Sequence, residues 1–232
     1  MVDLSIILYD ASLQSAAEFP EKFLRHKAIQ NDAAREGCPA EQLIVDVARH
    51  YPAIRELESS TRLKVGRPDL VHVSLLTLLH HPLMSVNPHR AYIHTIGDHW
   101  FRVPPDWRIP VNYIRFMGLM RQFFFSRRVP DSKEPILELN KGNLGELIQR
   151  EGLSGRKILL SSTGDQIAAE DLAANLSRSG GILIIGGFQK GKPSKKAIDV
   201  ADEACSIYPQ ELSSWTTISL VMTALLSHTR RV

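Results

Sequence analysis

The chain of 232 residues is 44% hydrophobic and 23% charged, with a net charge of +3 at pH 7. These totals exclude a disordered or fibrous chain, and the length suits one sizeable core, with or without an inserted subdomain. Cys38 and Cys205 are too few and too distant in sequence for a disulfide framework or a zinc site, and they fit a reducing compartment.

The N-terminal half mixes one clear strand with helical segments. Residues 4–9 are apolar and predict a buried strand rather than a signal peptide. A polar helical region is expected over about 13–35, and 42–49 fits either a strand or a helix. Residues 66–68 predict a turn, and Asp69 opens an apolar helix that runs to Leu79. Residues 82–88 predict a loop.

A hairpin and an arginine-rich helix follow. Residues 91–95 and 99–103 predict two paired strands. Pro110 suits the first turn of a helix, in which one apolar stripe is formed by Tyr113, Phe116, Met120 and Phe124. Residues 89–128 hold seven arginines, no lysine and two acids, a local charge of +5. Such a field fits a phosphate backbone, although a solvated helix surface gives the same pattern.

The C-terminal part alternates strands and helices, which predicts a parallel sheet covered on both faces. Strands are expected at 136–139, 157–161, 181–185 and 203–207, and helices at 143–150 and 169–177. Serines and threonines interrupt the last apolar run, 212–226, so we expect a buried helix there and no membrane span. Ligands bind beyond the carboxyl ends of such strands, where three loops are expected at 161–166, 186–193 and 206–213.

Few motifs carry chemistry on their own. The glycines of Gly-Gly-Phe-Gln-Lys-Gly (186–191) let backbone N–H groups approach a ligand or serve only the turn, and their spacing fits neither a dinucleotide fingerprint nor a phosphate loop. Asp69 can pair with Arg67 or cap the helix. The nine histidines lack carboxylates or cysteines at ligand spacing, so we expect no metal site, and His94 and His99 are expected to face solvent. Without a nucleophile motif, the hard chemistry of an enzyme would belong to a bound cofactor.

Four segments together resemble one known family. They are 66–76 (Gly-Arg-Pro-Asp-Leu-Val-His-Val-Ser-Leu-Leu), 92–95 (Tyr-Ile-His-Thr), 108–120 (Arg-Ile-Pro-Val-Asn-Tyr-Ile-Arg-Phe-Met-Gly-Leu-Met) and 185–191 (Ile-Gly-Gly-Phe-Gln-Lys-Gly). In this order they resemble the ribosome-biogenesis pseudouridine N1-methyltransferases of small-subunit rRNA, members of the SPOUT class. The resemblance extends over nearly the whole chain, and the short N-terminus is similar to the archaeal branch.

The resemblance implies one α/β domain over residues 1–232 with a C-terminal trefoil knot. Family-specific insertions, including the hairpin and the arginine-rich helix, are expected roughly within 20–66 and 88–115. It further implies a cytoplasmic homodimer without membrane contact, in which S-adenosylmethionine is the cofactor and small-subunit rRNA the partner. Ribosomal assembly proteins are further expected partners. The implied reaction is methylation of N1 of a pseudouridine, with a role in small-subunit biogenesis. The alternatives are a non-catalytic rRNA-binding assembly factor, or a SPOUT enzyme that methylates a ribose 2′-OH or a uridine.

The resemblance also assigns roles to residues. Arg67, Arg108 and Arg115 match RNA-contacting arginines, and Asp69 matches the acid that orients Arg67, so Arg67 and Asp69 are the expected catalytic pair. The cofactor is expected to contact the three loops through Ser161, Gly186, Gly187, Phe188, Gly191, Ser206, Ile207, Tyr208 and Leu212. The chain departs from the family at Val111, where arginine is usual, so one phosphate contact is expected to be missing.

Overall fold

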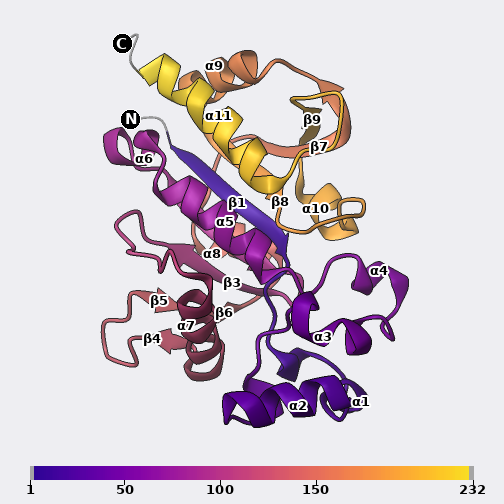
Figure 1. Cartoon of the computed structure of the whole chain (residues 1–232). Coiled ribbons are helices and arrows are strands. Elements are labelled where there is room, and N and C mark those ends of the chain that lie inside the picture. Colours follow the sequence, from indigo (N-terminus) through magenta and orange to yellow (C-terminus); the bar gives the residue numbers. More distant parts are fainter. Residues whose placement is uncertain (1–2, 230–232) are drawn as a thin grey trace.

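The computed structural model describes residues 3–229. Its main sheet has the strand order β6-β3-β2-β1-β8-β7-β9, with β1 near the centre of the fold (Figure 1). These strands are β1 (Leu4–Ala11), β2 (Arg90–Thr95), β3 (His99–Val103), β6 (Asn140–Lys141), β7 (Lys157–Gln166), β8 (Gly181–Gly186) and β9 (Glu203–Ser206). A separate two-stranded sheet pairs β4 (Arg128–Val129) with β5 (Leu137–Glu138).

Helices surround the main sheet and occupy most of the connections between strands. They are α1 (Glu21–Leu24), α2 (Lys27–Glu36), α3 (Val47–Ile54), α4 (Ser59–Arg62), α5 (Pro68–Leu79), α6 (Pro82–Val86), α7 (Tyr113–Ser126), α8 (Leu144–Arg150), α9 (Ala169–Ser179), α10 (Lys195–Val200) and α11 (Ser214–Thr229). The C-terminal β7–α9–β8–α10–β9–α11 order confirms the expected alternation, and β1, β2, β7, β8 and β9 pair in parallel.

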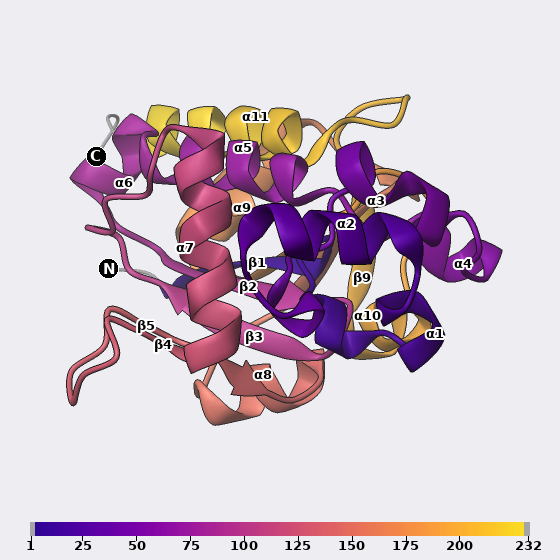
Figure 2. The same cartoon turned by 60° about the horizontal axis from the view of Figure 1, so that its bottom comes forward.

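The sheet is mostly parallel, with β3 antiparallel to β2 and β6, and both of its faces are buried. Along β1, Leu4, Ile6 and Leu8 pack into the larger core cluster with α5, α7, α9 and α11. Ile7 and Tyr9 point to the other face and join a second cluster with α8 and α10. Figure 2 shows α5 and α11 on one side of the sheet and α8 on the other. The expected α/β architecture is therefore confirmed.

A third cluster gives residues 16–65 a core of their own. It contains Phe23 of α1, Ile29 of α2, Ile54 of α3 and Val65, which follows α4. An ion pair of 3.0 Å between Arg121 Nη1 of α7 and Glu36 Oε2 of α2 joins this part to the arginine-rich helix. α7 therefore packs on the main core through Phe116, Met120 and Phe123, and it is joined to the small core's helix α2 by this ion pair.

Several sequence expectations were wrong in their bounds. The helical region 13–35 is broken at Pro20 and His26, and its start is extended because Ser15 bridges to Ile44. The open segment 42–49 becomes the start of α3, capped by Asp46 at the backbone N–H of Ala48 (2.8 Å). The expected loop 82–88 contains α6, because His81 Nδ1 caps its first turn at 3.2 Å from the N of Leu83.

Two further expectations fail for reasons of packing. Residues 136–139 form β5 in the small sheet, where Leu137 pairs with Val129, and do not enter the main sheet. His94 was expected to face solvent, but it is 1% exposed, and its Nε2 lies 3.5 Å from Asp98 Oδ1. Within residues 3–229, no helix is long and apolar enough to cross a membrane.

Candidate methyl-transfer site

Two of the three expected loops, 186–193 and 206–213, leave the carboxyl ends of β8 and β9. The third, 161–166, was wrong as a loop: these residues continue β7, where Asp165 and Gln166 pair with β9 after a shift of register. The register aligns Leu160 of β7 with Ile185 of β8 on one side and with Cys205 of β9 on the other. The next residues along these strands are Ser161, Gly186 and Ser206. The three expected cofactor segments therefore begin side by side, although they are far apart in sequence.

The glycine loop, residues 186–193, approaches β1 closely. The backbone N–H of Gly187 donates to the carbonyl of Tyr9, and the N–H of Ser12 donates to the carbonyl of Gly187, both at 2.8 Å. A Cβ on Gly187 would lie 2.7 Å from Cα of Ala11. Gly187 is thus required for close packing, and its N–H is already used within the protein rather than free for a ligand.

The other predicted residues of this edge differ in exposure. The Ser206 hydroxyl donates to the carbonyl of Tyr208 at 2.7 Å and closes the last loop, while the Tyr208 ring is 48% exposed. Ile207 and Leu212 are half-buried, and Gly191 is exposed with φ of +115°. The loop after β9 therefore offers both an ordered backbone turn and an aromatic side chain at the surface.

A cavity of about 380 Å³ adjoins the second half of β7. Its polar rim includes Ser161 and Thr163, whose hydroxyl oxygens lie 3.0 Å apart. The remaining lining residues are Leu159, Lys192, Pro193, Ile198, Ala201, Glu203 and Ala204. This volume is within the usual range for small-molecule sites. Ile198 and Ala201 were missed because α10 was not predicted, although Ser194 caps that helix at the N–H of Ala197 (3.4 Å).

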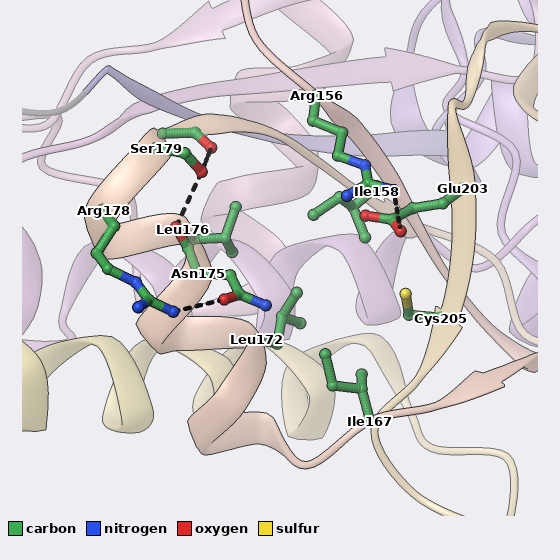
Figure 3. Close-up of a pocket in the computed structure, with 11 residues that line it drawn as sticks. Arg156, Ile158, Ile167, Leu172, Asn175, Leu176, Arg178, Ser179, Glu203 and Cys205 are labelled. Atoms are coloured by element: carbon green, nitrogen blue, oxygen red, sulfur yellow. Dashed lines mark hydrogen bonds and ion pairs between the residues drawn. The ribbon is translucent and has the colours of Figure 1, made fainter.

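A second cavity, of about 350 Å³, lies between α9 and the edge strand β9 (Figure 3). Its floor is apolar, and its charged groups are already paired. Arg156 forms an ion pair with Glu203 at 2.9 Å, and Arg178 donates to the Asn175 side chain at 2.8 Å. Because the cavity extends to Arg156 and Gly180, at the amino ends of β7 and β8, we do not assign it to the site.

Arg67 and Asp69 form a two-pronged ion pair at the start of α5. Arg67 Nε and Nη2 donate to the two carboxylate oxygens of Asp69, each at 2.8 Å. The backbone N–H of Arg67 donates to the Ser12 hydroxyl at 2.8 Å, so Ser12 connects this turn to Gly187. Asp69 lies in the first helical turn after Pro68, and Arg67 is the N-cap residue. Asp69 therefore pairs with Arg67 and is not the N-cap residue of α5.

The ion pair sets the electrostatics of this turn. Burial alone would raise the pKa of the Asp69 carboxyl, but its hydrogen bonds and charge attraction to Arg67 outweigh burial and lower that pKa below its usual value. The hydrogen bonds that Arg67 donates to Asp69 raise the pKa of the Arg67 guanidinium. Asp69 is therefore a weak base, and its carboxylate is suited to fixing the direction of the guanidinium.

The arginine-rich helix begins later than expected. Asn112 caps it by accepting the N–H of Arg115 at 3.1 Å, so α7 starts at Tyr113 and Pro110 stays in the preceding loop. The Pro110 carbonyl instead accepts a hydrogen bond from Nε2 of buried His72 at 2.7 Å. The His72 ring stacks on Phe116 at a centroid distance of 4.3 Å. These contacts fix the loop that carries Arg108.

The arginines on this surface are free to meet a ligand. Arg108 and Arg115 are exposed, and no carboxylate in residues 3–229 forms an ion pair with either. Val111 and Ile114 lie beside them and are 70% and 72% exposed. The Tyr113 hydroxyl donates to Asp46 Oδ2 at 2.8 Å and holds the start of α7, a contact that sequence spacing did not reveal. The surface thus combines unpaired guanidinium groups with exposed apolar side chains.

Comparison with known proteins identifies relatives along the whole chain. Residues 6–226 match the family model described as EMG1/NEP1 methyltransferase. A protein of Staphylothermus marinus named ribosomal RNA small subunit methyltransferase Nep1 is 36% identical over 220 residues, which is 94% of this chain and 93% of that protein. The Nep1 of Pyrococcus furiosus is 34% identical, with 94% of each chain covered.

A solved structure agrees with the sequence matches. The crystal structure of Archaeoglobus fulgidus Nep1 bound to S-adenosylhomocysteine superposes with a TM-score of 0.82 and covers 100% of both chains at 28% identity. The likeness therefore includes the sheet, the helices on both its faces and the segments inserted between them.

Proposed function

This chain belongs to the EMG1/NEP1 methyltransferase family, and from that premise we propose that it methylates N1 of a pseudouridine in small-subunit rRNA. The observation that carries the proposal is the double contact of Ser12, which joins the Arg67–Asp69 turn to the glycine loop through two hydrogen bonds of 2.8 Å. One short loop thus holds the expected RNA-contacting residue against the expected cofactor loop.

The residues present fit S-adenosylmethionine, which would supply an electrophilic methyl group on a sulfonium. The cavity beside Ser161 has the size of a small-molecule site. In this proposal, Gly186, Gly191 and residues 206–212 contact the cofactor through backbone groups. Gly187 and Phe188 act by shaping the loop, since Gly187 packs on β1 and Phe188 packs edge-on against Tyr9 at 5.7 Å.

RNA would bind across the exposed arginines. Arg108 and Arg115 contact phosphates, and the target base is extruded from a structured loop toward Arg67. The N1 proton would pass to water, and N1 would then take the methyl group as its bond to the sulfonium sulfur breaks, which would leave S-adenosylhomocysteine. Because pairing lowers the pKa of Asp69, we assign this carboxylate to orientation of Arg67, and we assign stabilisation of the anionic base to the guanidinium.

The wider setting follows from the same proposal. A substrate in rRNA implies the cytoplasm, a role in small-subunit biogenesis and contact with ribosomal assembly proteins. We further propose a homodimer, which would double the arginine surface, and a trefoil knot in the C-terminal loops. Light scattering of the purified chain tests the dimer directly.

The activity is tested with two matched RNA hairpins, one with uridine and one with pseudouridine at the target. We expect labelled methyl groups from S-adenosylmethionine to enter only the pseudouridine RNA. Label in both hairpins would favour a broader RNA methyltransferase. Salt-sensitive binding without label would favour a non-catalytic assembly factor.

A further inference from the structure

Lys64 and Asp10 form a buried ion pair beneath the glycine loop. Lys64 Nζ lies 2.8 Å from Asp10 Oδ2, and the two side chains are 12% and 6% exposed. No other carboxylate in residues 3–229 forms an ion pair with Lys64. Burying two opposite charges adds little net stability, so such a pair suggests a role in fixing geometry.

Lys64 also contacts the glycine loop on two sides. Its Nζ lies 4.3 Å from the ring centroid of Phe188, a distance typical of a cation–π contact. Its Cε lies 3.6 Å from the position a Cβ on Gly191 would take. Lys64 thus spans the loop from its first aromatic residue to its last glycine.

Asp10 is held in an unusual backbone conformation at the end of β1. Its φ of +46° lies in the left-handed region, which aspartate tolerates better than most residues. Two residues later, Ser12 contacts both Gly187 and Arg67. The segment that supports the Arg67 turn therefore also supplies the carboxylate that holds Lys64.

The outer part of the glycine loop has few other anchors. Within the described part of the chain, residues 188–193 take part in no backbone or side-chain hydrogen bond, and residues 189–192 are exposed. The Phe188 ring contacts Tyr9 on one side and Lys64 on the other. The position of this segment therefore depends on Lys64 and Phe188.

We propose that Lys64, held by Asp10, is a positioning residue that keeps the glycine loop in the conformation that receives the cofactor. The inference rests on the proposed function, because it takes this loop as part of the S-adenosylmethionine site. Without the lysine, the loop would sample other conformations, and apparent affinity would fall by the fraction of time spent in them.

The test compares Lys64→Met with the double variant Asp10→Asn/Lys64→Met and with Lys64→Arg. The double variant removes both charges, so that no carboxylate is left buried without a partner if the single variant fails to fold. Lys22→Met is the control, since Lys22 of α1 lies outside the site and forms an exposed ion pair of 3.1 Å with Glu56. Calorimetry measures S-adenosylhomocysteine binding without RNA, and methyl transfer gives kcat and KM.

We expect the methionine variants to bind S-adenosylhomocysteine about tenfold more weakly, which corresponds to a loop that is correctly placed about a tenth of the time. KM for S-adenosylmethionine should rise in step, while kcat at saturation changes less than about twofold. Lys64→Arg should stay nearer to wild type, and Lys22→Met should match it.

Unchanged binding in the folded double variant would overturn the inference, as would a loss confined to kcat. If a variant only folds less completely, calorimetry would show fewer binding sites per chain but an unchanged affinity at each site. A wild-type protein that binds no S-adenosylhomocysteine would instead count against the proposed function itself.

Discussion

Arg67 is directed by three local contacts. Asp69 accepts two hydrogen bonds from its guanidinium, Ser12 accepts its backbone N–H, and Pro68 fixes the first turn of α5. A planar guanidinium bound at two points keeps one direction, which a single contact would not ensure. The Arg67–Asp69 pairing was therefore one that the spacing of the Arg-Pro-Asp motif could suggest.

Replacement of Asp69 by asparagine should remove the second acceptor oxygen and let the guanidinium turn. We expect methyl transfer to fall by about 10- to 100-fold, since small misplacements at a reacting centre have effects of this size. RNA binding should change little, because Arg108 and Arg115 remain. The measurement is kcat alongside RNA affinity, with exposed Asp131→Asn as the control. A parallel loss of both quantities would contradict the orienting role.

Val111 offers a gain-of-contact test on the arginine surface. It is 70% exposed beside Arg108 and Arg115, and the family resemblance implies an arginine at this position. Val111→Arg should tighten RNA binding and steepen the salt dependence of log K by about 0.7. Val86→Arg, at a position 64% exposed on α6, is the control. An unchanged slope would show that RNA does not cross this surface.

At the scale of single elements, two glycines differ in whether the space around them would admit a side chain. A Cβ on Gly187 would meet the backbone of β1 at 2.7 Å, while a Cβ on Gly118 of α7 meets nothing within 4 Å. Gly187→Ala should therefore lower the free energy of unfolding by about 1–3 kcal/mol. Gly118→Ala should raise it by about 0.5–1 kcal/mol through helix propensity. Urea unfolding compares the two, and similar effects from both would refute the distinction.

Sequence periodicity predicted the elements with strong local signals. The apolar run of α5, the hairpin β2–β3 and the strands β7, β8 and β9 were expected near their observed positions, although β7 continues through 161–166, where a loop was expected. α6 was missed because its cap is a histidine, His81. The start of α7 was placed too early because Pro110 suggested a first helical turn, whereas Asn112 is the cap.

The contacts between distant segments could not be predicted from spacing. Lys64 meets Asp10 across 54 residues, Tyr113 meets Asp46 across 67, and His72 meets Pro110 across 38. Each of these contacts depends on how helices dock on the sheet rather than on local pattern. Arg67 and the arginine-rich helix could therefore be named as candidates from local motifs, but the distant residues that contact them could not.

The whole molecule buries several histidines, which makes its stability depend on pH. Burial lowers the pKa of His50, His72 and His94, and for His50 it outweighs the hydrogen bond to Asp32. Because the unfolded chain would bind protons at these sites near pH 6.5 and the folded chain would not, stability is full above this pH and falls below it.

Urea unfolding between pH 7.5 and 5.5 measures this dependence. We expect the free energy of unfolding to decrease as the solution is acidified, by up to about 1.4 kcal/mol per pH unit for each such histidine. Carboxylates with lowered pKa values, such as Asp69, titrate below this window. A flat profile would show that the buried histidines are not held neutral.

The proposed reaction is tested most directly by identifying the methylated nucleoside. The RNA hairpin with pseudouridine is treated with the protein and S-adenosylmethionine carrying a deuterated methyl group, then digested and analysed by mass spectrometry. We predict N1-methylpseudouridine as the labelled product, formed about 10- to 100-fold more slowly by the Asp69→Asn variant. A label on a ribose 2′-oxygen or on another base atom would contradict the proposed chemistry, even if the protein binds the RNA tightly.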